Sequence, residues 1–307
     1  MLKKLSKKTV LTVIAILVVL VAVAVGETVH AFSGGGSKGT ITVGAKGFAE
    51  NEILASLYQI ALQENGYDAK FVDNLDGDVL HSAINSGKID FYPEYTNTGV
   101  VMVLKHDPIF DPEKAYQYVK EQYKKKYNIV WLNQSAINDT YGFVITKKVA
   151  DQYGISTISQ LCENSPKLRL AQMYDWNADP AIGEALDKTY GKFKFADVKT
   201  YNAGLVYPVL KEEKADALVA QTTDPQLEDT STYVLLKDDK KVWPPYYLTP
   251  IIRQSTLDKY PGVEGIINSV TKEVSGSDIL ELNRQVMIDK KEFQDVARKF
   301  YDSHIKK

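Results

Sequence analysis

The stretch Ser86-Gly-Lys-Ile-Asp-Phe-Tyr-Pro-Glu-Tyr-Thr-Asn-Thr-Gly99 runs from an apolar segment directly into a turn rich in aromatic and hydroxyl groups. Residues 89–92 predict a short β-strand. Pro93 has no N–H to offer a sheet, so we expect it to end the strand and to leave Tyr95 and Thr98 on a loop at the strand's carboxyl end. Ligands of open α/β sheets bind at that end, so this loop is a candidate ligand site.

Two strands and two helices are predicted before this strand. Residues 40–45 alternate as a strand, and residues 50–65 place apolar side chains at helical spacing before Gly66. Residues 71–72 then predict a strand, and residues 79–85 a short helix. The resulting order, β-α-β-α-β, is the unit of a doubly wound α/β sheet.

The same α/β pattern restarts after Tyr141 and ends near Lys241. A chain of 307 residues suits two lobes better than a single core. We therefore expect lobe 1 over residues 40–142 plus 242–307 and lobe 2 over residues 143–241. The chain would cross between the lobes twice, which makes a hinge with a ligand cleft between the lobes.

The N-terminus has the layout of an export signal, with four lysines before an uninterrupted apolar-plus-Thr run over residues 9–25. Residues 1–31 are therefore a signal peptide cleaved after Ala31 or a retained membrane anchor, since the run also reaches the lower length limit of a membrane-spanning helix. Residues 32–39 form a flexible Gly/Ser linker. Both alternatives place residues 40–307 at the outer face of the cell membrane.

Charge and spacing argue against several classes of function. The chain carries a net charge of −2, and its first 31 residues hold four Lys and one Glu, so the remainder carries −5 and is not suited to nucleic acid. The four histidines are scattered without metal spacing, and no nucleophile or nucleotide motif is present. Cys162 is the only cysteine, which we interpret as a buried, inert thiol. We expect no catalysis, no metal and no cofactor.

Five short motifs follow one another in a fixed order. They are VGAKGFAEN (43–51), YPEYTNTG (92–99), NDTY (138–141), DALVAQTTD (216–224) and PPY (244–246). With these motifs the chain resembles the substrate-binding proteins of ABC importers for quaternary ammonium compounds such as glycine betaine, carnitine and choline, from about Thr40 to the C-terminus. The resemblance implies a periplasmic-binding-protein-like fold of type II, and permease and ATPase subunits as partners.

The resemblance also implies an aromatic cage. A quaternary ammonium has no N–H to donate, so electron-rich ring faces bind it through cation–π attraction. The tyrosines at the matching motif positions are Tyr95, Tyr141 and Tyr246. The polar positions that accompany them are Asn51, Thr98 and Gln221.

The chain departs from the family pattern in three places. Gln221 stands where relatives often place another cage tyrosine, and Asn177 falls near the position of an arginine that binds a ligand carboxylate. Asp76 and Asp78 occupy a turn that is neutral in relatives, and we expect Asp78 near the N-cap of the following helix. These departures favour a cation such as choline over the zwitterion glycine betaine.

Two other functions stay open on the sequence alone. The same fold, tethered by the N-terminal helix, serves equally as a sensory domain without transport. An extracytoplasmic hydrolase is the remaining alternative, although it needs a nucleophile and base that the motifs do not supply.

Overall fold

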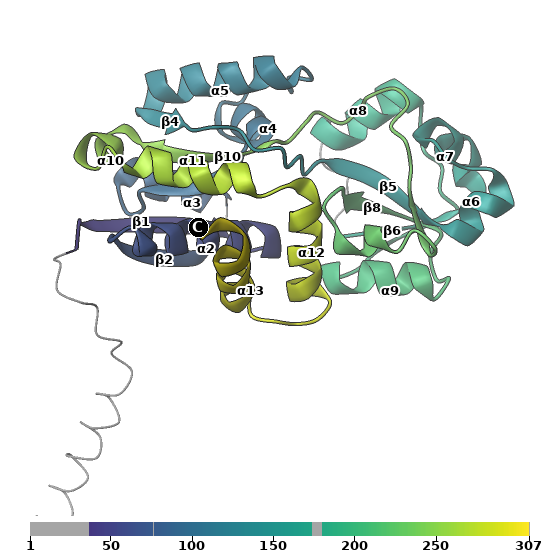
Figure 1. Ribbon diagram of the computed structural model, residues 1–307. Coiled ribbons are helices and arrows are strands. Elements are labelled where there is room, and N and C mark those ends of the chain that lie inside the picture. The colour runs from purple at the N-terminus through teal and green to yellow at the C-terminus, as the bar shows by residue number, and fades with distance from the viewer. Residues whose placement is uncertain (1–36, 76, 174–179, 307) are drawn as a thin grey trace, which may run out of the picture. The chain divides into compact units, whose positions relative to one another are not determined.

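The first lobe begins with the predicted β-α-β-α-β unit, which is confirmed (Figure 1). It comprises β1 (Thr40–Lys46), α2 (Ala49–Glu64), β2 (Asp68–Leu75), α3 (Gly77–Ser86) and β3 (Phe91–Tyr95). Strand β1 pairs in parallel with both β2 and β3. The computed structural model describes residues 37–75, 77–173 and 180–306. The predicted export segment, most of the linker, Asp76 and Asn177 lie outside these residues.

Two antiparallel strands complete the first sheet, whose order is β2-β1-β3-β10-β4. Strand β10 (Leu248–Arg253) lies between β3 and β4 (Ile129–Trp131), so a late segment of the chain inserts into an early sheet. The remaining helices of this part are α4 (Thr96–Thr98), α5 (Pro112–Tyr127), α10 (Gln254–Lys259), α11 (Val263–Glu273), α12 (Gly276–Met287) and α13 (Phe293–Phe300).

The expectation that Pro93 ends its strand is wrong. Pro93 lies inside β3 and is paired with Pro250 of β10. Two prolines cannot exchange the N–H···O bonds of a hydrogen-bonded antiparallel pair, so they occupy a non-hydrogen-bonded position, where a missing N–H removes no bond between β3 and β10. Tyr95 is therefore the last residue of the strand rather than a loop residue, and Thr98 lies in the short helix α4.

The acidic turn before α3 also differs from expectation. Asp73 and Asn74 belong to β2, so the strand extends further than predicted, and Asp78 lies in the first turn of α3, after Gly77. Asp78 thus sits one position inside the helix, where a carboxylate still faces the positive end of the helix dipole.

A second five-stranded sheet has the order β7-β6-β8-β5-β9. Its strands are β5 (Tyr141–Thr146), β6 (Arg169–Gln172), β7 (Asp197–Thr200), β8 (Ala217–Gln221) and β9 (Tyr233–Leu235), and its helices are α6 (Lys147–Tyr153), α7 (Ile158–Asn164), α8 (Pro180–Tyr190) and α9 (Val206–Lys211). Cys162 is half-buried on α7, and its Sγ donates to the carbonyl oxygen of Tyr190 at 3.4 Å. Burial raises the pKa of this thiol, which disfavours the reactive thiolate.

The chain passes between the two sheets along two segments, one after β4 and one before β10. These segments pair with each other. Asn138 forms an isolated antiparallel bridge with Tyr247, and the Asp139 N–H donates to the Tyr246 carbonyl at 3.1 Å. The Thr140 hydroxyl donates to the Pro244 carbonyl at 2.8 Å. Because the crossing segments are hydrogen-bonded to each other, side chains on both are held at one place.

Helix α12 adds a contact between the parts of the chain that carry the two sheets. The Asn283 amide Nδ2 donates to the backbone carbonyl of Thr223, which follows β8, at 3.1 Å. Figure 1 shows α12 beside the elements of the second sheet. The boundaries at residues 142 and 241 stay a prediction. Within the described residues, no helix is both long and apolar enough to cross a membrane.

Candidate functional site

An aromatic cluster lies where the two crossing segments meet. Tyr141 opens β5 and Tyr246 precedes β10, and their ring centroids are 5.9 Å apart with the ring planes at 84°. Trp243 also contacts Tyr141, with ring centroids 5.6 Å apart and ring planes at 51°. Gln221 is the register partner of Tyr141 in the β5–β8 pair. Three of the six predicted site residues are therefore brought together, from three separate segments of the sequence.

Hydrogen bonds of the crossing segments fix this cluster. The Asn138 side chain accepts from the Tyr246 backbone N–H at 2.7 Å, which ties the second tyrosine to the first crossing. The Thr222 hydroxyl donates to the Asn138 carbonyl at 3.0 Å and accepts from the Thr140 N–H at 3.1 Å. The backbone on both sides of each ring is thereby held, so the rings are positioned by the fold rather than by one another alone.

Tyr95 has a different environment. Its side chain is buried, its ring stacks on Phe48 at 6.1 Å, and the Lys46 ammonium lies 5.1 Å from the ring centroid. Its hydroxyl donates to Oε1 of Glu50 at 2.8 Å. Burial raises the pKa of Tyr95 well above its usual value, and the Glu50 carboxyl adds to this shift. The Tyr95 ring is thus in contact with two other side chains of the protein, Phe48 and Lys46.

Asn51 and Thr98 complete the set of predicted contacts. Asn51 is fully buried, accepts from the Lys46 backbone N–H at 2.8 Å and donates to the Pro93 carbonyl at 2.9 Å. It therefore holds β1 against β3. Thr98 is half-buried in α4, whose residue Asn97 donates to the Pro245 carbonyl in the second crossing segment at 2.6 Å. A direct contact of Asn51, Tyr95 or Thr98 with a ligand stays a prediction.

Buried carboxyl groups lie beside the aromatic cluster, and the sequence analysis missed them. Glu50 and Asp139 are 2% and 7% exposed. Asp139 accepts from Gln221 Nε2 at 3.1 Å and from the Thr223 hydroxyl at 2.8 Å. Burial raises the pKa of both carboxyl groups; Asp224 adds to the shift of Glu50, and Glu50 and Asp224 add to the shift of Asp139. Glu50 and Asp139 lie inside two of the five family motifs, and Trp243 directly precedes a third, PPY. Their positions in these motifs could have identified them from the sequence.

Lys46 and Arg169 are each paired with a carboxylate of the protein. Lys46 forms an ion pair with Glu94, and both side chains are largely buried. Arg169 forms a bidentate pair with Asp216 through Nε and Nη2, at 2.8 and 2.9 Å. Among the described residues, no group of three or more His, Cys, Asp or Glu side chains is arranged to hold a metal ion.

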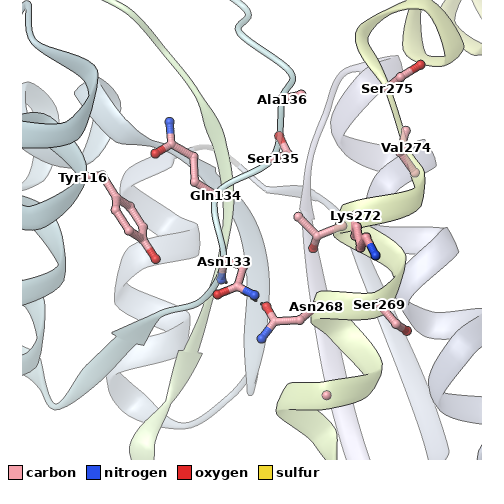
Figure 2. Close-up of a pocket in the computed structure, with 12 residues that line it drawn as sticks. Tyr116, Asn133, Gln134, Ser135, Ala136, Asn268, Ser269, Lys272, Val274 and Ser275 are labelled. Carbon is pink, nitrogen blue, oxygen red and sulfur yellow. Dashed lines mark hydrogen bonds between the residues drawn. The ribbon is translucent and has the colours of Figure 1, made fainter.

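A separate hollow of about 750 Å³ lies on the first lobe, between the segment after β4 and α11. Figure 2 shows Asn133 and Asn268 facing each other across it, and the Asn133 N–H donates to Asn268 Oδ1 at 3.0 Å. Its one aromatic side chain, Tyr116, donates its hydroxyl proton to the Leu132 carbonyl at 2.6 Å. With a single ring and none of the predicted site residues, this hollow does not have the chemistry of an ammonium cage.

Comparisons with known proteins identify relatives of the chain. The chain is 29% identical over 271 residues to the carnitine transport binding protein OpuCC of Listeria monocytogenes, covering 87% of each chain. It is 28% identical over 275 residues to a glycine-betaine-binding protein of Pseudomonas aeruginosa, covering 86% of this chain and 88% of that one. A crystal structure described as a glycine betaine/carnitine/choline ABC transporter superposes with a TM-score of 0.77 at 29% identity, covering 86% of this chain and 98% of the other.

The family model for the substrate-binding domain of ABC-type glycine betaine transport systems matches residues 39–303. That span contains both sheets, both crossing segments and every predicted site residue. The members of this family bind solutes for transporters and are not classed as enzymes. The chain belongs to the family of substrate-binding domains of ABC-type glycine betaine transport systems.

Proposed function

We propose that this protein captures a quaternary ammonium compound at the aromatic cluster of Tyr141, Tyr246 and Trp243 and delivers it to an ABC importer. The observation that carries the proposal is the perpendicular contact of Tyr141 and Tyr246 at the paired crossing segments. Two rings at right angles form a corner, and a trimethylammonium group fits against such a corner by cation–π attraction of about 0.5–2 kcal/mol per ring.

The position of the cluster supports capture by closure. Tyr141 belongs to the second sheet, and Tyr246 leads into the first, so a relative movement of the two lobes changes the space between the rings and a bound ligand. Hinged two-lobed binding proteins close in this way. The partners of the protein are then a permease and an ATPase, and its place of action is the outer face of the cell membrane.

Within the family's ligands, we propose that choline binds at least as well as glycine betaine. The carboxyl groups of Glu50, Asp139 and Asp224 lie together beside the cluster. The Lys46 ammonium is already paired with Glu94. Neutral or acidic surroundings favour a cation and make desolvation of a ligand carboxylate cost about 1–3 kcal/mol.

Calorimetric titration of the purified protein with choline, glycine betaine, carnitine and ergothioneine tests this proposal. We expect saturable binding of one ligand per chain, with choline at least as tight as glycine betaine. Choline and its neutral isostere 3,3-dimethylbutan-1-ol serve as matched probes, and only the cation is expected to bind. A clear preference for glycine betaine contradicts the choice of ligand, and absence of binding for all quaternary ammonium compounds contradicts the function.

A further inference from the structure

The hydroxyl group of Thr96 bridges the two peptide groups on either side of Tyr246. It donates to the Pro245 carbonyl at 3.3 Å and accepts from the Tyr247 N–H at 3.1 Å. Thr96 is fully buried, and its backbone N–H also donates to the Tyr247 carbonyl at 3.0 Å. One residue of α4 therefore bonds the second crossing segment both before and after the ring of Tyr246.

Asn97 adds a second donor to the Pro245 carbonyl. Its Nδ2 donates to that carbonyl at 2.6 Å and to the Ile109 carbonyl at 3.0 Å, and its Oδ1 accepts from the Ile109 N–H at 2.9 Å. Asn97 is fully buried. Because the backbone at Ile109 bonds both ends of the amide group, the amide is held in one orientation, with its second N–H toward Pro245.

The other polar groups of these two peptides bond the first crossing segment. The Tyr246 N–H donates to Asn138 Oδ1 at 2.7 Å, and the Tyr246 carbonyl accepts from the Asp139 N–H at 3.1 Å. All four polar groups of the two peptides that flank the Tyr246 Cα atom thus have a partner. Since the planes of these two peptides define φ and ψ of Tyr246, the direction in which its side chain leaves the backbone is fixed.

The bonds from α4 join Tyr246 to the first sheet. Helix α4 directly follows β3, and Leu248 of β10 pairs with Tyr95 at the end of β3. Tyr141, in contrast, opens β5 of the second sheet, where Gln221 is its register partner. The two tyrosines of the aromatic cluster are therefore held by different sheets, and the position of Tyr246 depends on the residues after β3.

We propose that Thr96 is a positioning residue for ligand binding, whose hydroxyl fixes the backbone at Tyr246 and so holds that ring where an ammonium group packs against it. The effect on affinity rests on the proposed function. Thr96 acts through Tyr246 and needs no contact with the ligand, whereas the sequence analysis placed the polar contact of this motif at Thr98.

Titration of choline into Thr96→Val and Thr96→Ser is the first test. Valine keeps the shape but leaves the Tyr247 N–H without its acceptor, so we expect binding to weaken by about twofold to thirtyfold, the range for one cation–π contact. Serine keeps the hydroxyl and should bind within about twofold of the unsubstituted protein. Thr271→Val is the matched control, because it deletes a buried hydroxyl of α11 that bonds Tyr58 and the Ile267 carbonyl. We expect it to lower stability without lowering affinity.

A double-mutant cycle separates positioning from a general loss of stability. In the Tyr246→Leu background the ring through which Thr96 acts is gone, so Thr96→Val should change the choline affinity there by less than about twofold. An equal fold-loss from Thr96→Val in both backgrounds would show that Thr96 does not act through Tyr246, and the inference would be overturned.

A measurement without ligand distinguishes this inference from the proposed function. The NMR signal of the Tyr246 ring, identified by its absence in Tyr246→Phe, depends on the contact of that ring with Tyr141. In the unliganded protein we expect this signal to shift in Thr96→Val and to stay in place in Thr96→Ser and Thr271→Val. An unshifted signal in Thr96→Val overturns the inference even if choline binds. If the signal shifts but no quaternary ammonium compound binds, the positioning role stands and the proposed function fails.

Asn138→Ala supplies the same test if Thr96→Val does not fold. Asn138 is half-buried, and its Oδ1 is the acceptor for the Tyr246 N–H. We expect Asn138→Ala to shift the ring signal and to weaken choline binding, and Asn138→Asp, which keeps an acceptor, to do neither. An unchanged signal and unchanged affinity in Asn138→Ala would show that the backbone bonds do not set the position of the ring, which contradicts the inference.

Discussion

Two tyrosine environments at the lobe junction differ in what surrounds the ring. Tyr95 is buried in the first lobe, with its hydroxyl bound to Glu50 and its ring beside Phe48 and Lys46. Tyr141 and Tyr246 are partly exposed and meet ring against ring where the crossing segments pair. The comparison separates side chains that build the site from side chains suited to line it, although all three occupy motif positions of one family.

Asn51 is a buried residue that supports the site, and its substitution has the largest expected effect on the free energy of unfolding. Asn51→Ala removes the partners of two buried backbone groups, on Lys46 and Pro93, at about 1–3 kcal/mol for each unsatisfied group. We expect denaturant unfolding to show a loss of about 3 kcal/mol or more. Asn65→Ala, at the end of the same helix, removes only a bond to the Ala61 carbonyl and should cost less than about 1 kcal/mol. Similar losses for the two variants would show that Asn51 is not a structural support.

Tyr95→Phe keeps the ring and removes the hydroxyl that donates to Glu50. We expect the free energy of unfolding to fall by about 1–3 kcal/mol, because a buried carboxyl oxygen loses its donor, while choline affinity changes by less than threefold. Tyr118→Phe, a partly exposed ring on α5, is the control for loss of a hydroxyl. A large loss of choline affinity with unchanged stability would show that Tyr95 contacts the ligand rather than supporting the site.

Tyr246→Leu tests whether Tyr246 lines the ligand site. Leucine preserves apolar volume but lacks the ring quadrupole, so we expect choline binding to weaken by about 0.5–2 kcal/mol, with little effect on unfolding. Isothermal titration measures the first quantity and urea unfolding the second. Tyr246→Phe retains the ring face and should bind within a factor of about three of the unsubstituted protein. Equal choline affinity in the Leu and Phe variants would show that cation–π attraction to Tyr246 does not contribute to binding.

Gln221→Tyr has the smallest expected effect of these substitutions on choline binding. A ring placed beside Tyr141 adds a third tyrosine face and should tighten choline binding by about 0.5 kcal/mol. The same change removes the bond from Gln221 to Asp139, which limits the gain. Gln221→Leu removes that bond without adding a ring and is the matched control. Competition between choline and tetramethylammonium in the two variants isolates the effect of the ring.

Periodicity and turn residues were sufficient for the main elements of the fold. The β-α-β-α-β unit of the first lobe follows from apolar spacing and from Gly66 after the first helix. The extent of β3 was not predictable from local preference, because the position of Pro93 depends on its partner Pro250, which is more than 150 residues away. Tertiary pairing decided that proline's role.

The candidate site was predictable only in part. Motif order placed Tyr141, Tyr246 and Gln221 together, but the sequence gives no sign of which tyrosine hydroxyl is bound to a buried carboxyl group. The pairing of Glu50 with Tyr95 joins a helix start to a strand end. Burial of Asp139 likewise arises from the folding of two distant crossings onto each other. Contacts of this kind depend on three-dimensional packing rather than on spacing along the chain.

The most direct test of the central claim is a side-by-side titration of choline into Tyr95→Phe and into the double variant Tyr141→Leu/Tyr246→Leu. If the crossing segments carry the ligand wall, Tyr95→Phe binds choline with nearly the affinity of the unsubstituted protein, and the double variant loses about 1–4 kcal/mol, the sum for two rings. Retained binding in the double variant, with binding lost in Tyr95→Phe, would contradict the assignment.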